Sequence, residues 1–304
     1  MTDEPTTPRW TAGHPVEIDS TVAHSARVYD YLLGGSDNFA VDRDAARQVA
    51  AFVGGMDNAR AEARANRAFL GRAVRWLAAE AGIRQFLDIG TGIPNADNVQ
   101  TIALRAAPDA RVVSVDHDPV VLAHAHQLLG PGDPARTAYL QADLRDPDVI
   151  LARAGRTLDL AAPVALLLVG VLHHVADHDD PHAIVAHLMR NLAPGSYLAV
   201  SHLATSARPC AQGTAATGAP ASARGTAAGG TPDDPAGCVV GGAERVMQQP
   251  WVARDRAAVE RFFRGLVLVE PGIVQVDGWR LAGAPEPVPG AWVAPLHVGV
   301  GRKP

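Results

Sequence analysis

The sequence predicts an α/β fold in which a mostly parallel sheet is covered by helices on both faces. Three observations lead to this prediction. Beyond residue 82, short apolar runs alternate with helical stretches, which is typical of parallel sheets. The run at residues 163–172 is apolar at every position, as expected for a central strand buried on both faces. Three of the helical stretches open with proline, which costs nothing in a first helical turn.

The first 82 residues precede this alternation and differ in character. Residues 1–20 are polar and contain proline, so we expect a flexible arm. Residues 21–82 predict three helices, at residues 25–34, 42–52 and 57–81. Ser25 is the candidate N-cap of the first helix, Gly34 ends it, and Gly82 caps the third.

The elements of the sheet follow in order. The apolar runs predict five strands, with the sequences QFLDI, RVVSV, AYLQA, PVALLLVGVL and SYLAVSHL, at residues 85–89, 111–115, 138–142, 163–172 and 196–203. Helices are expected between them, beginning at Pro94, Pro119, Pro147 and about Asp180. This order predicts one domain over residues 83–304.

The C-terminal part of that domain begins with an interruption. Residues 205–242 consist mostly of Ala, Gly, Thr, Ser and Pro, which bury little apolar surface, so we expect a low-complexity insertion. An amphipathic helix is expected at residues 254–264. The runs at 265–272 and 291–300 then predict two strands that close the sheet as a hairpin.

Composition excludes several classes of protein. The chain has 304 residues, of which 47% are hydrophobic, so it can bury a sizeable core. Its net charge of -5 argues against a nucleic-acid partner, because such binding needs a concentrated basic face. No secretory signal and no stretch of about 18 to 20 apolar residues is seen, so we expect a cytoplasmic protein with no membrane partner. Cys210 and Cys238 lie in the low-complexity stretch and are interpreted as incidental thiols.

A glycine turn after the first strand is the strongest local signal. Gly90 and Gly92 let the backbone approach a ligand closely. Asn95 stands where a dinucleotide fingerprint has its third glycine, which argues against a bound pyrophosphate. Asp88, at the end of the strand, would repel a diphosphate but suits a cationic amino group.

Carboxylates also stand at the ends of the next two strands. Asp116 could accept hydrogen bonds from both hydroxyls of a ribose, and Asp143 from an exocyclic adenine amine. Open parallel sheets bind ligands at this edge. The alternative is that these aspartates are helix caps or turn formers.

These segments resemble a known family. D-I-G-T-G, V-D-x-D-P, A-D-L-R-D-P and L-H-H-V resemble the class I S-adenosylmethionine-dependent methyltransferases. More narrowly, H-S-A-R-V-Y-D-Y-L-L-G-G-S-D-N-F at residues 24–39 and A-R-A-N-R-A-F-L at residues 63–70 resemble an S-adenosyl methyltransferase family of high-GC bacteria. The resemblance covers about residues 22–203 and resumes at about residue 254.

The resemblance implies a fold, a cofactor and a reaction. The fold is a Rossmann-like sheet of seven strands with an antiparallel C-terminal hairpin, and the reaction is methyl transfer from S-adenosylmethionine to a small-molecule acceptor. The implied cofactor contacts are Asp88, Gly90 and Gly92 on the methionine moiety, Asp116 on the ribose, and Asp143 with Leu144 on the adenine. His117, next to Asp116, is a further candidate cofactor contact.

The N-terminal helices predict a lid over the cofactor. Polar and aromatic side chains occupy nearly every face of the first helix, whereas a purely structural helix shows a cleaner apolar stripe. The candidate lid and substrate residues are Arg27, Tyr29, Tyr31, Gly34 and Asn38. Arg64 and Arg67, three apart on the third helix, could bind the cofactor carboxylate or an acidic substrate; of the two, Arg67 is the candidate cofactor contact. Ordinary packing and a solvated helix face are the alternatives for these side chains.

His173 follows the fourth strand and is the candidate catalytic base. A structural histidine is the alternative interpretation. His178 and His182 have a spacing that suits zinc, but Pro181 places a helix start between them, so no metal site is predicted. A non-catalytic S-adenosylmethionine sensor and an NAD-dependent oxidoreductase are the competing functions, and the oligomeric state is left open.

Overall fold

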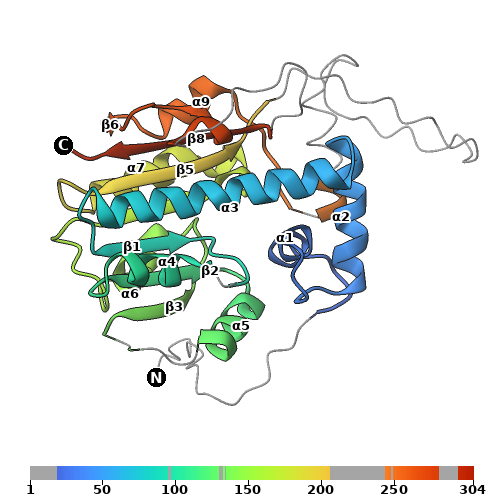
Figure 1. Cartoon of the computed structure of the whole chain (residues 1–304), viewed down its shortest axis with the longest axis horizontal. Helices are drawn as coiled ribbons and strands as arrows, with labels where there is room; N and C mark the ends of the chain where they lie inside the picture. Colours follow the sequence, from blue (N-terminus) through green and yellow to red (C-terminus); the bar gives the residue numbers. More distant parts are fainter. Residues whose placement is uncertain are drawn as a thin grey trace, which may run out of the picture.

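The computed structural model describes residues 19–94, 97–129, 133, 135–205, 244–247, 249–280 and 294–304. These residues form one sheet with helices on both faces (Figure 1). The strand order is β3-β2-β1-β4-β5-β8-β6, and β7 also pairs with β8. The strands are β1 Gln85–Ile89, β2 Arg111–Asp116, β3 Thr137–Gln141, β4 Ala165–Val169, β5 Tyr197–Leu203, β6 Val267–Leu268, β7 Val274–Gln275 and β8 Leu296–Arg302.

The first five strands are parallel, as predicted, and their side chains alternate between two cores. Phe86 and Leu167 face one side of the sheet and pack with α3 (Met56–Ala79) and α4 (Val99–Ala106). Leu87 and Leu166 face the other side and pack with α6 (Pro147–Ala154), α7 (Pro181–Arg190) and α9 (Arg256–Arg261). The helix α5 (Pro119–Leu129) packs against β2 and β3. Burial on both faces accounts for the uniformly apolar sequence of β4.

The C-terminal strands are antiparallel to the rest of the sheet, as predicted, and one edge of β8 is shared by two short strands. β8 pairs with β5 on one edge and with β6 and β7 on the other, all antiparallel. β6 and β7 are two short segments along the same edge of β8, so the sheet has seven positions across although eight strands are described. The implied hairpin is therefore an interrupted one.

The N-terminal segment forms α1 (Ser25–Leu33), α2 (Ala40–Phe52) and the long α3, which runs across the sheet (Figure 1). Gly34 adopts a left-handed conformation and ends α1 as predicted. The N-cap of α1 is His24 rather than Ser25. α2 begins two residues earlier than predicted because the Asp42 carboxylate accepts the Phe39 N–H and thereby fixes the first turn.

The helix after β1 begins later than predicted. We expected it at Pro94, but α4 begins at Val99 because the Asn98 side chain accepts the Thr101 N–H as an N-cap. α9 is also shorter than expected, since Asp255 caps it and Arg254 lies outside it.

Several predictions concern residues outside the described part of the chain. These are most of the arm at 1–20 and the insertion at 205–242, together with Asn95, Cys210 and Cys238. Two short 3₁₀ helices follow β4, η1 (Leu172–His174) and η2 (Asp177–Asp179), and a third, η3 (Val276–Gly278), follows β7. Among the described residues, no helix has the length and apolar character needed to cross a bilayer.

Candidate functional site

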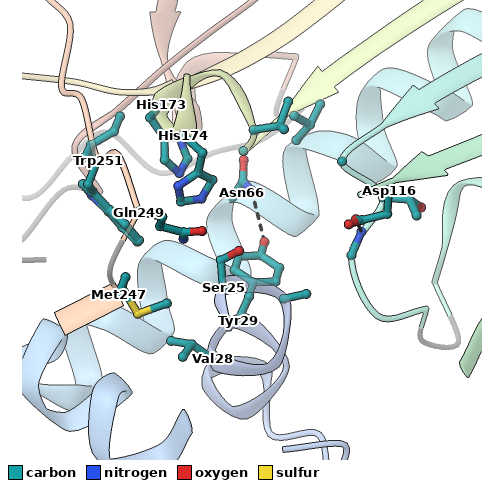
Figure 2. A pocket seen from close by; sticks show the side chains of 18 of the residues that line it. Ser25, Val28, Tyr29, Asn66, Asp116, His173, His174, Met247, Gln249 and Trp251 are labelled. Atoms are coloured by element: carbon teal, nitrogen blue, oxygen red, sulfur yellow. Dashed lines mark hydrogen bonds between the residues drawn. The ribbon is translucent and has the colours of Figure 1, made fainter. Parts of the chain in front are cut away.

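A cavity of about 310 Å³ lies at the carboxyl ends of the parallel strands, beneath the N-terminal helices. Three sets of residues line it. The strand-end wall comprises Asp88–Gly92, Asp116, His117, residues 142–145 and residues 169–171. The helical wall comes from α1, α2 and α3. The histidine wall comprises His173, His174, Gln249, Pro250 and Trp251. In Figure 2, Tyr29 and Asn66 lie between Asp116 on one side and the histidine wall on the other.

The strand-end wall contains the predicted glycine turn. Gly90 and Gly92 have φ angles of 77° and 66°, a region that L side chains rarely adopt. A Cβ on Gly90 would lie 2.5 Å from Cγ2 of Val171, so this position accepts only glycine without a shift. The Gly90 N–H donates to the Val115 carbonyl at 2.8 Å, which holds the turn against β2.

Two predicted carboxylates flank this turn. Asp88 is buried, and burial raises its pKa to about 6, although a hydrogen bond from Thr91 and the Arg67 charge act in the opposite direction. The Asp116 carboxylate accepts the Gly92 N–H at 2.9 Å and the Asp118 N–H at 3.0 Å. Asp116 is thus held rigidly at the cavity, and each of its oxygens keeps a further lone pair for a ligand.

The third predicted carboxylate is already paired. Arg145 binds Asp143 with both Nε, at 2.9 Å, and Nη2, at 2.6 Å. This hydrogen bonding lowers the pKa of Asp143 and raises that of Arg145. Leu144 is buried beside it. His117 lines the cavity while its ring stays 57% exposed, with its centroid 5.3 Å from that of His24.

The helical wall connects α1 to the sheet through a chain of hydrogen bonds. The Tyr29 hydroxyl donates to the Ala63 carbonyl at 3.0 Å and accepts from Asn66 Nδ2 at 3.1 Å (Figure 2). The Ser201 hydroxyl donates to Asn66 Oδ1 at 2.5 Å. Asn66 therefore joins the first helix to β5 at the middle of the cavity.

Of the five candidate lid residues, Tyr29 lines the cavity. The other four, all in the described part of the chain, do not line it; these are Arg27, Tyr31, Gly34 and Asn38. The buried Arg27 guanidinium binds the Asp42 carboxylate at 3.1 Å and loop carbonyls instead. Asn38 donates to Asp30, and the ring of Tyr31 lies under Arg60. These side chains hold the shape of the α1–α2 turn.

The histidine wall contains the candidate base. His173 is buried, its ring lies 4.3 Å from that of His174 and 5.4 Å from that of Trp251, and its Nδ1 has no hydrogen-bond partner among the described residues. Burial lowers the pKa of His173 far below its usual value and that of His174 to about 4. Both imidazoles are therefore neutral near pH 7.

Arg254 holds the histidine wall in place. This buried guanidinium donates to the carbonyls of Leu172 and Val175, each at 3.0 Å, to His202 Nε2 at 2.8 Å and to Asp177 at 2.6 Å. One carbonyl belongs to the first residue of η1 and the other to the residue that follows η1, so Arg254 fixes the turn that presents His173.

The side chains of this cavity that the sequence analysis did not single out include Glu62 and Asn66 on α3, and Gln249 and Trp251 after the low-complexity segment. Glu62 is half-buried, and burial raises its pKa to about 7. Glu62 and Asn66 share a helical face with the buried Ala59, Ala63 and Leu70. Polar residues on that otherwise apolar face were the available signal.

A metal site is not found among the described residues. His178 is exposed next to Asp179 in η2. His182 Nε2 contacts the Ala258 carbonyl at 3.0 Å, and its ring stacks on Phe262 at 4.2 Å. The two imidazoles therefore have separate surroundings.

Comparison with known proteins identifies the family. The family model for S-adenosyl methyltransferases matches residues 11–229 and 230–304. The chain belongs to the S-adenosyl methyltransferase family. A DUF574-family protein from Streptomyces avermitilis is 39% identical, with 94% of this chain and 99% of that chain covered and a TM-score of 0.77. A candidate methyltransferase from Thermobifida fusca is 36% identical, with 94% and 96% covered and a TM-score of 0.77. A comparison with curated proteins found no match.

Membership confirms the predicted family, its S-adenosylmethionine cofactor and the enzyme class. The strand-end wall of the methyltransferase fits that cofactor. It offers a glycine turn with no room for a side chain at Gly90 and two buried carboxylates, which suit an ammonium group and a ribose. The competing oxidoreductase interpretation is therefore set aside.

Proposed function

We propose that the methyltransferase acts on a small-molecule acceptor that binds between the helical wall and the histidine wall, while the cofactor binds the strand-end wall. The observation that carries this proposal is that all three walls border one cavity. A ligand on the glycine turn and a second ligand beside Trp251 would therefore meet near Tyr29 and Asn66. Residues 21–82 would act as the lid of this cavity.

Each predicted cofactor contact has a role in this proposal. The Asp88 carboxylate would bind the ammonium group of the methionine moiety, and Arg67, which lines the same cavity, its carboxylate. Asp116 would bind the ribose hydroxyls, with His117 beside it. Asp143 and Leu144 would border the adenine, with Asp143 held by Arg145. When bound, the cofactor supplies an electrophilic methyl group, so the protein has to orient the acceptor and accept a proton.

The position of His173 suits a proton acceptor, but its lowered pKa argues against that role. A general base works best when its pKa lies near the working pH, and burial keeps the imidazole of His173 neutral far below pH 7. Its unpartnered Nδ1 supports a role in binding the acceptor by a hydrogen bond.

Calorimetric titration with S-adenosylmethionine, S-adenosylhomocysteine and NAD tests the proposal. We expect the first two to bind and NAD not to bind. Asp116→Asn should weaken both by roughly 10- to 100-fold, since it removes charge-assisted hydrogen bonds. Asp109→Asn, at an exposed ion pair with Arg84, is the matched control and should change nothing. Equal affinity in both variants would contradict the placement of the ribose.

A further inference from the structure

Glu62 is an ionisable side chain of the cavity to which the proposed function assigns no contact with cofactor or acceptor. Glu62 lies on α3, one turn before Asn66, and lines the cavity. Among the described residues, its carboxyl group makes no hydrogen bond and no ion pair. Glu62 is half-buried, so its carboxylate is only partly hydrated, and a ligand that fills the cavity and donates a hydrogen bond to it would make up for the hydration that is lost.

The surroundings of Glu62 define the rest of the ligand. Apolar side chains make up much of the helical wall: Val28 and Leu32 on α1, Val49 on α2, and Val53 directly after α2. Trp251 packs against the same apolar cluster as Val28 and Val49 and adds an aromatic ring to this part of the cavity. Gln249 and His173 also line the cavity, and Gln249 Nε2 and His173 Nδ1 are buried without a hydrogen-bond partner among the described residues. The pocket therefore combines apolar and aromatic surface with a few unsatisfied polar groups, which is typical of sites for small organic molecules.

We propose that Glu62 is the general base of the methyl transfer, and that the acceptor is a hydroxyl group carried by an apolar, ring-containing molecule. This inference rests on the proposed function. The acceptor ring would pack against Trp251 and the valines of α1 and α2, and its hydroxyl would donate to the Glu62 carboxylate.

The step balances in atoms and charge. As the acceptor oxygen bonds to the methyl carbon, the carbon–sulfur bond breaks with its electron pair left on sulfur, and the hydroxyl proton moves to Glu62. The negative charge on Glu62 and the positive charge on sulfur vanish together, which is favourable in a pocket of low polarity. A protonated amine would place a second positive charge beside the first, so the electrostatics favour a hydroxyl.

The pKa values support this choice over His173. Burial raises the pKa of Glu62 to about 7, close to the value that suits a base at neutral pH. Burial also raises the pKa of Tyr29, with a smaller contribution from the Glu62 charge, so these two groups are neighbours. The other titratable groups that line the cavity are Arg67, Asp88, Asp116, His117, Asp143, Arg145, His173 and His174.

Binding of simple probes tests the acceptor class. With the protein saturated by S-adenosylhomocysteine, calorimetry at pH 8 compares 2-naphthol, its methyl ether 2-methoxynaphthalene, and 2-naphthylmethylamine. We expect 2-naphthol to bind about tenfold tighter than the ether, and this preference to disappear in Glu62→Gln. Glu260→Gln, at an exposed position on α9, is the control and should keep it. Tighter binding of the amine, or binding of none of the three, would overturn the hydroxyl acceptor.

Methylation of 2-naphthol tests the base. With saturating cofactor, the rate of ether formation should rise with pH through about 7 in the wild-type protein. Glu62→Gln should lose about 100-fold in rate at unchanged S-adenosylhomocysteine affinity. An unchanged rate or pH profile in Glu62→Gln would overturn the role of Glu62, and so would absence of methylation in the wild type. Failure of the wild type to bind S-adenosylhomocysteine would instead contradict the proposed function.

Discussion

The strand-end wall and the histidine wall of the cavity are held in place by different means. In the strand-end wall, residues near each other in the chain or on adjacent strands fix the geometry, as where Asp116 accepts the Gly92 N–H. In the histidine wall, η1 is held by Arg254, 82 residues beyond Leu172. The strand-end wall, our proposed cofactor site, is therefore shaped by local backbone structure, whereas the histidine wall, on the proposed acceptor side, depends on long-range packing.

The largest effect is expected where the histidine wall relies on one residue. Arg254→Met keeps apolar bulk but removes the donors to two carbonyls and to His202 Nε2. Leaving buried acceptors unpaired should lower the free energy of unfolding by about 3 kcal/mol or more. Urea denaturation measures this loss. Asp177→Asn is the control, because that carboxylate is 79% exposed and its ion pair with Arg254 adds little. Equal losses in both variants would show that the carbonyl contacts of Arg254 do not hold η1.

A smaller loss is expected in the strand-end wall, where the backbone itself is the constraint. Gly90→Ala introduces a Cβ at a positive φ and 2.5 Å from Val171, so the free energy of unfolding should fall by about 2 to 3 kcal/mol. Gly82→Ala shares the positive φ but meets nothing within 4 Å, and should cost about 1 kcal/mol. Thermal and urea denaturation of the two variants separate the clash from the backbone strain. Identical losses would mean that Val171 moves aside freely.

The same division explains what the sequence could predict. The order of strands, the glycine turn and the carboxylates at three strand ends follow from runs of a few residues, and the structure contains them. The start of α4 was misplaced because Pro94 is a permitted helix start, whereas the Asn98 side chain is the cap that forms. Asp143 was expected to be open to a ligand, and its ion pair with Arg145 depends on rotamers that sequence patterns do not specify.

The acceptor side was harder to predict because its residues are distant in the chain. Glu62 lies on an otherwise apolar face of α3, and the cavity beside it exists only because α1 packs against α3. Trp251 follows a segment without periodic pattern. His173 was found from its place after β4, but its neutral state arises from burial beside His174 and His202. Burial that depends on residues far apart in the chain cannot be predicted from the local sequence around His173.

The last comparison uses pH, because His202, which binds Arg254 behind the histidine wall, and Asp88 in the strand-end wall change stability in acid with opposite sign. Burial lowers the pKa of His202 to about 3, whereas in the unfolded chain an imidazole titrates near 6.5. The unfolded state therefore binds the proton first, and stability is lost as the pH falls below about 6.5. Burial raises the pKa of Asp88 to about 6, so the folded state binds that proton first and stability is gained as the pH falls toward 4.

Urea denaturation at pH 7 and pH 5, without cofactor, tests this sign. In His202→Gln, the fall in unfolding free energy between the two pH values should be about 2 kcal/mol smaller than in the wild type; in Asp88→Asn it should be about 1 kcal/mol larger. The variants and the wild type share Glu62 and His174 and are compared over the same pH interval, so the contributions of these two groups to the pH dependence cancel. If His202→Gln behaved like the wild type, folding would leave the pKa of His202 unchanged. Burial and the hydrogen bond from Arg254 to Nε2 would then not hold the imidazole neutral at pH 5.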